Sequence, residues 1–319
     1  MAIKPVLSKE EVKAIEEGYL QPAATLLLHR PAGANWQMWH NSGLAALGIA
    51  LENDSIVDVA INKDKYGYHY LIGKHKNSDG WINEGSPHYH YYPLEALLFT
   101  ANAVKCRGIK LFDKDLHDMF VEPVKGTYPD LSFPAHSDGW YGANLLSQSA
   151  LYEIADACYN DPLLKRVLEL TYAQKKRLDP EALLNNQTIN ASDEKMIQQS
   201  YSFDASGFCL LRSDARTVVL KFGGEGIGHG HPDKLSITIH DGKNELVSDF
   251  GTSGYGVPDY LKWYKRSLSH NTVTVDAKDQ KRSVGRLLKF TSRPDGGYAE
   301  AETVTAYPGV DMKRSLDLK

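Results

Sequence analysis

The sequence is poor in cysteine, in long apolar runs and in clustered basic residues. Its 319 residues include three cysteines, whose odd number and wide spacing favour buried free thiols over a disulfide framework. No run of 18 apolar residues occurs, so we expect no membrane-spanning helix. Lys and Arg number 36 against 40 Asp and Glu, giving a net charge of −4 without a basic block, which argues against a nucleic-acid partner.

The composition is that of an ordinary globular protein. Hydrophobic residues make up 42% of the chain and charged residues 24%. This length is sufficient for two domains that each bury a core. Residues 1–17 are charged and lack the apolar centre of a secretory signal, so we predict no signal peptide here. The localisation and the oligomeric state stay open.

Apolar residues recur at helical spacing in the first part of the chain. The segment 36–51 has this period and is followed by Asn53-Asp54, which predicts the end of a helix. A second helix is predicted to begin at Pro93 and to end before Gly108. Further helices are predicted over 143–157 and 162–176. The loops at 66–70, 81–92 and 132–142 are rich in Tyr, Trp, His and Gly, which is typical of a groove that stacks flat rings on sugars.

The period changes near residue 200. Short segments rich in β-branched and apolar residues lie at 207–212, 217–222, 235–240 and 246–250. Asp241-Gly242 between two of them predicts a hairpin, and another strand is predicted over 270–276. The sequence therefore predicts a multidomain α+β chain, with a helical domain over 1–195 and an antiparallel β domain over 196–319. The few strands counted indicate that the β domain is incomplete.

Histidine and aspartate gather in the strand-rich part. His229-Gly-His231-Pro-Asp is followed by Asp249 and His270, and the predicted hairpin can bring these segments together. Two imidazoles and a carboxylate suit zinc, so His231, Asp249 and His270 are candidate ligands. In an extended segment His229 and His231 share a face, so both can point into one site. The alternative is a Gly- and His-rich turn whose imidazoles are hydrogen-bonded within the loop.

Five motifs follow one another along the chain. They are Asn35-Trp-Gln-x-Trp-His40, Trp81-x-x-Glu-Gly-Ser-x-x-Tyr-His90, His229-Gly-His-Pro-Asp-Lys234, Asp249-x-Gly-Thr-x-Gly-Tyr255 and His270-Asn-Thr272. As a set, over residues 31–285, they resemble the heparinase II/III superfamily, which includes heparin and heparan lyases and oligoalginate lyases. This chain is shorter than most members of that superfamily.

The resemblance implies a fold and a reaction. The fold would be an N-terminal α/α toroid, incomplete here, followed by an antiparallel β-sandwich with the active site in the groove between them. The reaction would be β-elimination on a uronic-acid-containing polysaccharide or oligosaccharide, either a heparin- or heparan-type glycosaminoglycan or alginate, with exo or endo action open. Relatives are commonly periplasmic or secreted.

The resemblance also implies catalytic residues. Tyr89 matches the proton-transferring Tyr of the toroid, and His229 matches the active-site His of the sheet domain. Tyr255 matches the sheet-domain Tyr, with Tyr260 as a competitor because the length of this loop varies among relatives.

Substrate-binding and metal-binding roles follow in the same way. Asn35 matches the residue that neutralises the uronate carboxylate, and His40, one helical turn later, is an alternative source of an imidazole. Zinc on His231, Asp249 and His270 would be structural. The expected substrate contacts are Trp36, Glu84, His90 and Arg266.

These residue types suit the reaction. The C5 proton of a uronate is weakly acidic while the neighbouring carboxylate is charged, so amide and imidazole donors favour the enolate-like charge that develops. Tyr ionises near pKa 10 and becomes a base only where positive charge stabilises the phenolate. Arg212, Lys234 and Arg266 are candidate sources of that charge.

Two other functions fit the same sequence. A glycoside hydrolase would need two carboxylates flanking the scissile bond, and Glu84 with Asp138 or Asp79 could form that pair. A carbohydrate-binding fragment without activity, held together by zinc, would fit the short length of the chain.

Overall fold

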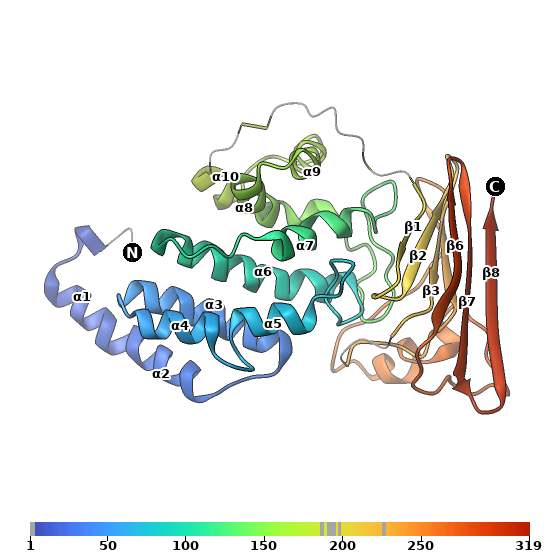
Figure 1. Ribbon diagram of the computed structural model, residues 1–319, viewed down its shortest axis with the longest axis horizontal. Coiled ribbons are helices and arrows are strands. Elements are labelled where there is room, and N and C mark those ends of the chain that lie inside the picture. Colours follow the sequence, from blue (N-terminus) through green and yellow to red (C-terminus); the bar gives the residue numbers. More distant parts are fainter. Residues whose placement is uncertain (1–3, 186–187, 190–195, 197–198, 225–227) are drawn as a thin grey trace. The chain divides into compact units, whose positions relative to one another are not determined.

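Helices occupy the first part of the chain and antiparallel strands the last part (Figure 1). The computed structural model describes residues 4–185, 188–189, 196, 199–224 and 228–319. The chain divides into two compact units, one of Met1–Lys76 with Tyr92–His117 and the other of Asn77–Tyr91 with Asp118–Lys319. The predicted domain boundary at 195/196 stays a prediction.

The helices include four that the periodicity of apolar residues predicted, near 36–51, 93–107, 143–157 and 162–176, and others that it did not predict. They are α1 (Lys9–Ile15), α2 (Gln21–His29), α3 (Ala34–Ala50), α4 (Asp54–Asn62), α5 (Tyr68–His75), α6 (Pro87–Val104), α7 (Lys114–Val124), α8 (Ser149–Tyr159), α9 (Pro162–Tyr172) and α10 (Pro180–Asn185). Asn53 separates α3 from α4, and its side chain accepts hydrogen bonds from the backbone N–H groups of Ser55 and Ile56. Asp161 caps α9 in the same way, with Pro162 as its first residue.

Two predicted helix starts are wrong, and one of them is that of α8, which begins at Ser149 instead of residue 143. Helix α6 begins at Pro87 and contains Pro93 in its interior. Ser86 precedes it, and the Ser86 hydroxyl accepts a hydrogen bond from the backbone N–H of Tyr89 at 3.3 Å. Proline has no backbone N–H, so Pro87 leaves no donor without a partner in the first turn. The helix therefore begins where a polar residue, Ser86, is followed by a proline. This start places Tyr89 in the first turn of the helix.

Two antiparallel sheets form the last part of the chain. One has the order β1-β2-β3-β4-β5 and the other β6-β7-β8. Their strands are β1 (Tyr201–Phe203), β2 (Phe208–Arg212), β3 (Thr217–Lys221), β4 (Ser236–His240), β5 (Glu245–Val247), β6 (Arg286–Arg293), β7 (Gly296–Tyr307) and β8 (Val310–Leu318). The predicted Asp241-Gly242 hairpin joins β4 to β5, and the Asp241 carboxylate accepts from the backbone N–H groups of Lys243 and Asn244.

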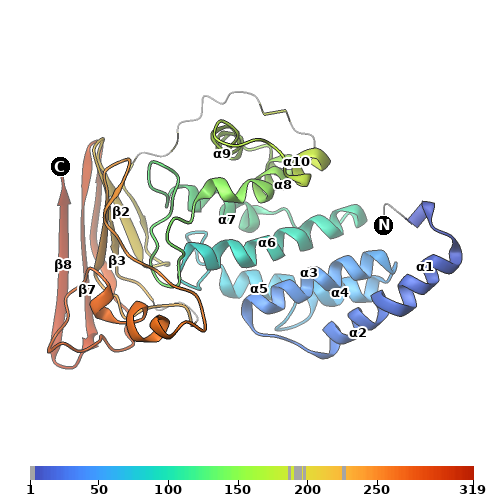
Figure 2. The same cartoon turned by 180° about the vertical axis from the view of Figure 1, so that it is seen from behind.

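The two sheets pack face to face as a sandwich (Figures 1 and 2). Cys209, Leu211, Leu220 and Phe222 of the first sheet meet apolar residues of the second sheet, such as Ala301, in one buried cluster. Every residue of β2 and β3 is buried. Two glycines allow a close crossing at the end of these strands, since a Cβ on Gly207 would lie 1.9 Å from the Cα of Gly223. The predicted order of a helical region followed by a β-sandwich is confirmed.

Two strand predictions need correction. The segment 270–276 is no strand, because Asp276 and Ala277 have φ values of 52° and 54° and the chain turns there. In the other direction, the long strands β6, β7 and β8 were not predicted. Most of their exposed residues are polar, with Leu288 and Val304 as exceptions, and the second sheet buries mainly small residues such as Ala299, Ala301 and Ala306.

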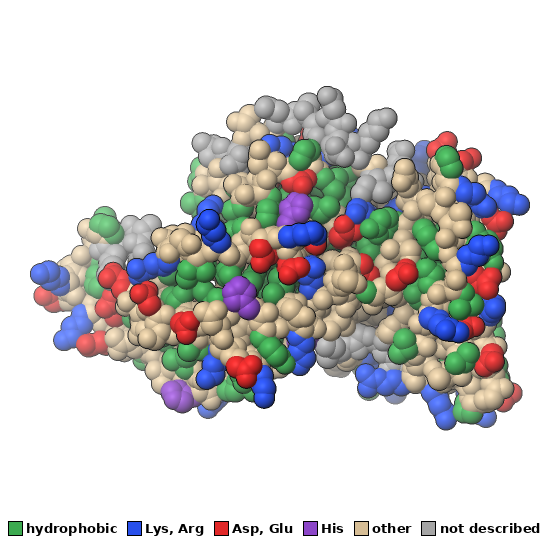
Figure 3. Space-filling model, viewed as in Figure 1, with side chains coloured by type: hydrophobic (Ala, Val, Ile, Leu, Met, Phe, Trp, Pro, Cys, Tyr) green, Lys and Arg blue, Asp and Glu red, His purple; other side chains and the backbone are tan. Residues whose placement is uncertain are grey.

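The surface carries both signs of charge. Figure 3 shows Lys and Arg side chains interspersed with Asp and Glu on the visible face, in keeping with the small net charge. Within the part of the chain that the structure describes, the helices are too short or too polar to cross a membrane.

Candidate active site

Tyr89 and His229 lie against one another. Their rings stack with centroids 3.5 Å apart and planes 13° from parallel. The Tyr89 hydroxyl donates a hydrogen bond to the Tyr255 hydroxyl at 2.7 Å, and the Tyr255 hydroxyl lies 2.8 Å from Nδ1 of His229. Three residues that are far apart in the sequence therefore share one contact network, and all belong to the second compact unit.

The network converges on Asp138, in the loop between α7 and α8. Its Oδ2 accepts hydrogen bonds from the hydroxyls of Tyr255 and Tyr260, both at 2.9 Å, and lies 3.0 Å from Nδ1 of His229. Its Oδ1 lies 2.9 Å from Nε2 of His231. Asp138 is fully buried. Asp138 was predicted only as a possible hydrolase carboxylate. Its place in the 132–142 loop, which is rich in His, Gly and Trp, was a signal that it belongs to the site.

Charge and burial set the protonation of this cluster. Burial alone would raise the pKa of Asp138, but hydrogen bonds from His229 and His231 lower it below its ordinary value. Burial, the hydrogen bond from Tyr89 and the Asp138 carboxylate raise the pKa of Tyr255 above its ordinary value. Burial and Asp138 raise the pKa of Tyr260 as well. Both phenols beside Asp138 therefore stay protonated at neutral pH.

The two competing tyrosines differ in exposure. Tyr255 is 55% exposed, whereas Tyr260 is 9% exposed. Both hydroxyls bind the same carboxylate oxygen, but the hydrogen bond from Tyr89 reaches Tyr255. Tyr255 is therefore the more accessible of the two to a molecule in solvent, and its predicted catalytic role stays a prediction.

Two further charged groups, Glu84 and Lys265, belong to this cluster. The Glu84 carboxylate lies 3.6 Å from Nε2 of His229, so the imidazole lies between Glu84 and Asp138. The Lys265 ammonium is 3.9 Å from Asp138 Oδ2, donates to the Gly228 carbonyl at 3.0 Å and lies over the Tyr260 ring. Lys265 was not among the predicted sources of positive charge, which were Arg212, Lys234 and Arg266. Glu84 is buried, and its predicted substrate-binding role stays a prediction.

Asn35, Trp36 and His40 lie on α3, in the first compact unit. Asn35 is buried and Trp36 is 65% exposed. His40 is partly buried, and within the described part of the chain its Nδ1 has no hydrogen-bond partner. The predicted role of Asn35 or His40 at a uronate carboxylate, and of Trp36 at a sugar, stays a prediction.

His90 and Arg266 have local partners. His90 is fully buried; its Nδ1 accepts from the backbone N–H of Ile82 at 3.1 Å, and its Nε2 lies 2.8 Å from the Met119 carbonyl. Burial lowers the pKa of His90 to about 4, so the ring is neutral. His90 thus supports the 81–86 loop in this arrangement, which differs from the predicted substrate contact. Arg266 forms an ion pair with Asp279 and is half-exposed.

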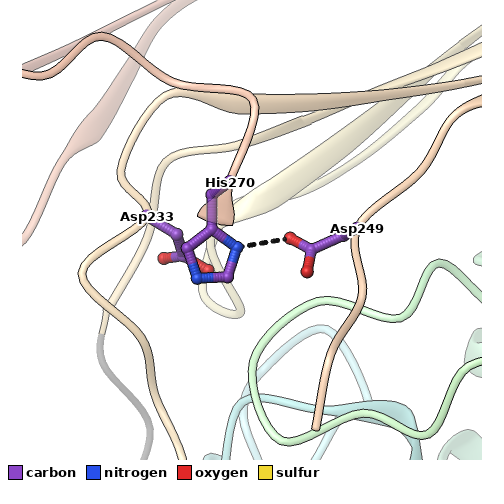
Figure 4. A group of neighbouring side chains, drawn as sticks. All are labelled: Asp233, Asp249 and His270. Atoms are coloured by element: carbon purple, nitrogen blue, oxygen red, sulfur yellow. Dashed lines mark hydrogen bonds and ion pairs between the residues drawn. The ribbon is translucent and has the colours of Figure 1, made fainter. Parts of the chain in front are cut away.

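The predicted zinc ligands lie together. Nδ1 of His231 is 3.3 Å from Nε2 of His270, and Nδ1 of His270 is 2.9 Å from Oδ2 of Asp249. Figure 4 shows the His270 imidazole between the carboxylates of Asp249 and Asp233. Asp233, Asp249 and His270 are close enough to hold one ion. Asp233 was not in the predicted set, and it is also paired with the buried Lys221 and Lys234.

The tautomers of His231 and His270 make this centre suited to a cation. Nε2 of His231 faces Asp138 and Nδ1 of His270 faces Asp249, so each ring donates its N–H to a carboxylate. The two nitrogens that face one another then both carry lone pairs, and they must share an added proton or a metal ion. Two imidazole nitrogens bound about 2.0–2.1 Å from a tetrahedral zinc lie about 3.4 Å apart, close to the observed separation. The spacing of these two imidazole nitrogens therefore fits zinc, whereas the Asp249 carboxylate lies at the opposite, Nδ1 edge of the His270 ring. The predicted zinc ligand set stays a prediction.

The last part of the chain matches a known family, and the whole chain is similar to several curated proteins. Residues 197–319 match the family described as Heparinase II/III-like, C-terminal. An alginate lyase of Stenotrophomonas maltophilia is 27% identical over 99% of this chain and 48% of its own length. An exo-oligoalginate lyase of Saccharophagus degradans is 24% identical over 99% of this chain and 48% of its own length. A heparin-sulfate lyase of Bacteroides stercoris is 25% identical over 75% of this chain and 35% of its own length.

Solved structures support the same fold. The structure of heparinase III matches 92% of this chain and 47% of its own chain, with a TM-score of 0.74 and 17% identity. A heparan sulfate lyase of Pedobacter heparinus matches 94% of this chain and 46% of its own, with a TM-score of 0.72 and 18% identity. This chain spans about half the length of the curated alginate lyases that it matches. The resemblance to the heparinase II/III superfamily is confirmed.

Proposed function

The chain carries a heparinase II/III-like C-terminal domain, and from that premise we propose that it acts as a polysaccharide lyase that cleaves uronic-acid-containing glycans by β-elimination. The observation that carries the proposal is the convergence of the Tyr89, His229 and Tyr255 side chains. The similarity to alginate and heparin-sulfate lyases supports the reaction class.

Tyr89 and Tyr255 form the proton-transfer pair in this proposal. Tyr89 acts as its phenolate, having released its hydroxyl proton to solvent. It takes the C5 proton, the electrons of the C5–H bond form a C4=C5 double bond, and the C4–O bond breaks with its electron pair going to the leaving oxygen. Tyr255 protonates the leaving oxygen, in keeping with the negative charge of Asp138 that favours its phenol form. The stacked imidazole of His229, when protonated, stabilises the phenolate of Tyr89.

The uronate carboxylate needs its own donors. We assign this task to Asn35, with His40 one helical turn later on α3 as the alternative. An amide or imidazole N–H that points at this carboxylate stabilises the charge that develops during proton removal. Trp36 is well exposed and suits stacking on a sugar ring.

Zinc is the proposed metal, held by His231, Asp249 and His270, with Asp233 as a neighbouring carboxylate. When bound, it would supply positive charge that fixes the segments around 231, 249 and 270. The Asp138 carboxylate contacts Nε2 of His231, on the side of the ring away from His270, and so fixes the orientation of this imidazole. A structural role fits because these residues are buried.

A substrate panel tests the proposal. The protein is incubated with alginate, oligoalginate, heparin and heparan sulfate, and both ultraviolet absorbance and reducing ends are measured. A lyase gives an unsaturated uronate with new absorbance, whereas a hydrolase gives reducing ends without it. Hydrolysis is less well supported because Asp138 is fully buried and already accepts several hydrogen bonds, which keeps it from a glycosidic oxygen. Binding without any product would overturn the lyase proposal.

A further inference from the structure

One buried carboxylate joins the tyrosine cluster to the metal-binding histidines. Oδ2 of Asp138 accepts hydrogen bonds from Tyr255 and Tyr260 and faces His229, whereas Oδ1 faces Nε2 of His231. The backbone N–H of Asp138 donates to the His229 carbonyl at 3.0 Å, which ties the carboxylate to the same segment that carries both histidines. All these contacts lie within the second compact unit.

We propose that Asp138 is a positioning residue of the site: its carboxylate aligns Tyr255 and His229 with one oxygen and holds the His231 ring with the other. The inference rests on the proposed lyase function and deepens it. Asp138 is fully buried and does not touch substrate, so it acts through the groups that it holds. The positions of the tyrosine pair and of the metal-binding histidines then both depend on the Asp138 carboxylate.

The chemistry of the contacts requires a carboxylate here. An ionised carboxylate only accepts hydrogen bonds, and it has room for about four donors. Every side chain around Asp138 offers an O–H or N–H to it. An asparagine has nearly the same shape, but its NH₂ group would point two hydrogens at groups that are themselves donors. Asp138→Asn therefore displaces the groups that contact either Oδ1 or Oδ2, while leaving the volume of the core unchanged.

The tautomer of His231 follows from the same geometry. With Oδ1 of Asp138 at 2.9 Å, His231 carries its proton on Nε2 and presents Nδ1 to His270. Without that acceptor, both tautomers of His231 become accessible and the ring loses its fixed orientation. Loss of such an outer partner typically weakens metal binding by about 10–100-fold.

The experiment compares the wild-type protein with Asp138→Asn and with Asp156→Asn. Asp156 on α8 is a matched control, because it is also buried and, among the described residues, its carboxylate has no hydrogen-bond partner. Three experiments are made: steady-state kinetics for kcat and KM on the best polymer of the panel, competition with a chelator for the dissociation constant of zinc, and long-range proton–nitrogen NMR for the imidazole tautomers. Thermal unfolding checks that each variant is folded.

We expect Asp138→Asn to lower kcat by at least about 100-fold with KM within about threefold, since positioned acid–base groups contribute about 10²–10⁴-fold. Zinc binding should weaken by about 10–100-fold, and the Nε2-protonated form of His231 should give way to a mixture. Asp156→Asn should match the wild type in all three. A folded Asp138→Asn protein with wild-type kcat would overturn the inference.

The NMR measurement separates this inference from the proposed function. If the wild-type protein cleaves none of the polymers, the lyase proposal fails, but the His231 tautomer still tests the role of Asp138. It also needs no variant, so misfolding of Asp138→Asn leaves the inference testable. A wild-type His231 protonated on Nδ1 would contradict the assignment.

Discussion

Replacement of Tyr89 by Phe removes one hydroxyl from the centre of the site and leaves the ring in place. The stacking on His229, with ring centroids 3.5 Å apart, needs only the ring. The hydrogen bond to the Tyr255 hydroxyl at 2.7 Å is lost. Since Tyr255 also contacts Asp138 and His229, it keeps its position. The substitution therefore tests the chemistry of the hydroxyl with little change in structure.

The expected effect on turnover is large and the effect on binding is small. Loss of a proton-transfer group costs about 10²–10⁴-fold in kcat, which corresponds to about 2.7–5.4 kcal/mol of activation free energy. KM should stay within about threefold because the aromatic face remains. The free energy of unfolding should fall by only about 0.5–1.5 kcal/mol, the usual net contribution of one hydrogen bond.

The assay is the initial rate of unsaturated uronate formation, followed by absorbance over a range of substrate concentrations. Tyr298→Phe on β7 is the matched control, because it removes a single tyrosine hydroxyl that donates to Glu300 in the second sheet. Tyr298→Phe should keep the wild-type kcat. If folded Tyr89→Phe retained kcat within about tenfold of wild type, Tyr89 would have no place in the proton transfer.

Three further predictions concern the metal centre and the folded state. His231→Ala should lower zinc content and melting temperature together, and metal analysis with calorimetry tests this; an unchanged zinc content would remove His231 from the ligand set. Burial holds the pKa of His136 at about 3 and that of His90 at about 4, so below pH 6.5 the unfolded chain binds protons that the folded chain does not. These two groups should therefore reduce the free energy of unfolding by about 3 kcal/mol between pH 6.5 and 5. Urea unfolding of the wild type should show this pH dependence, and His90→Gln should lose about half of it; an unchanged dependence in His90→Gln would contradict the reasoning. The buried Arg212 guanidinium donates to the carbonyls of Lys125, Thr127 and Gln199, so Arg212→Met should destabilise the protein by about 3 kcal/mol or more, and an unfolding midpoint equal to wild type would contradict this.

Local patterns predicted many elements well. Helical spacing located α3 within two residues at its start and one at its end, and Asn53 marked the helix end because its side chain satisfies the free N–H groups of α4. The Asp241-Gly242 pair predicted the β4–β5 hairpin because its turn geometry is local. Prediction failed at 270–276, where β-branched residues suggested a strand but hydrogen bonds to distant segments, such as Asn271 to the Ser248 carbonyl, hold an irregular segment.

The sequence by itself determined the order of helical and strand-rich parts, the family resemblance and the candidates Tyr89, His229, His231 and His270. These depend on periodicity and on motifs that a reader can find within short windows. Only the tertiary structure decided that Asp138 binds His229 and Tyr255, which lie 91 and 117 residues further along the chain. No local pattern encodes that choice, because a carboxylate finds its donors only after loops from separate segments have packed around it.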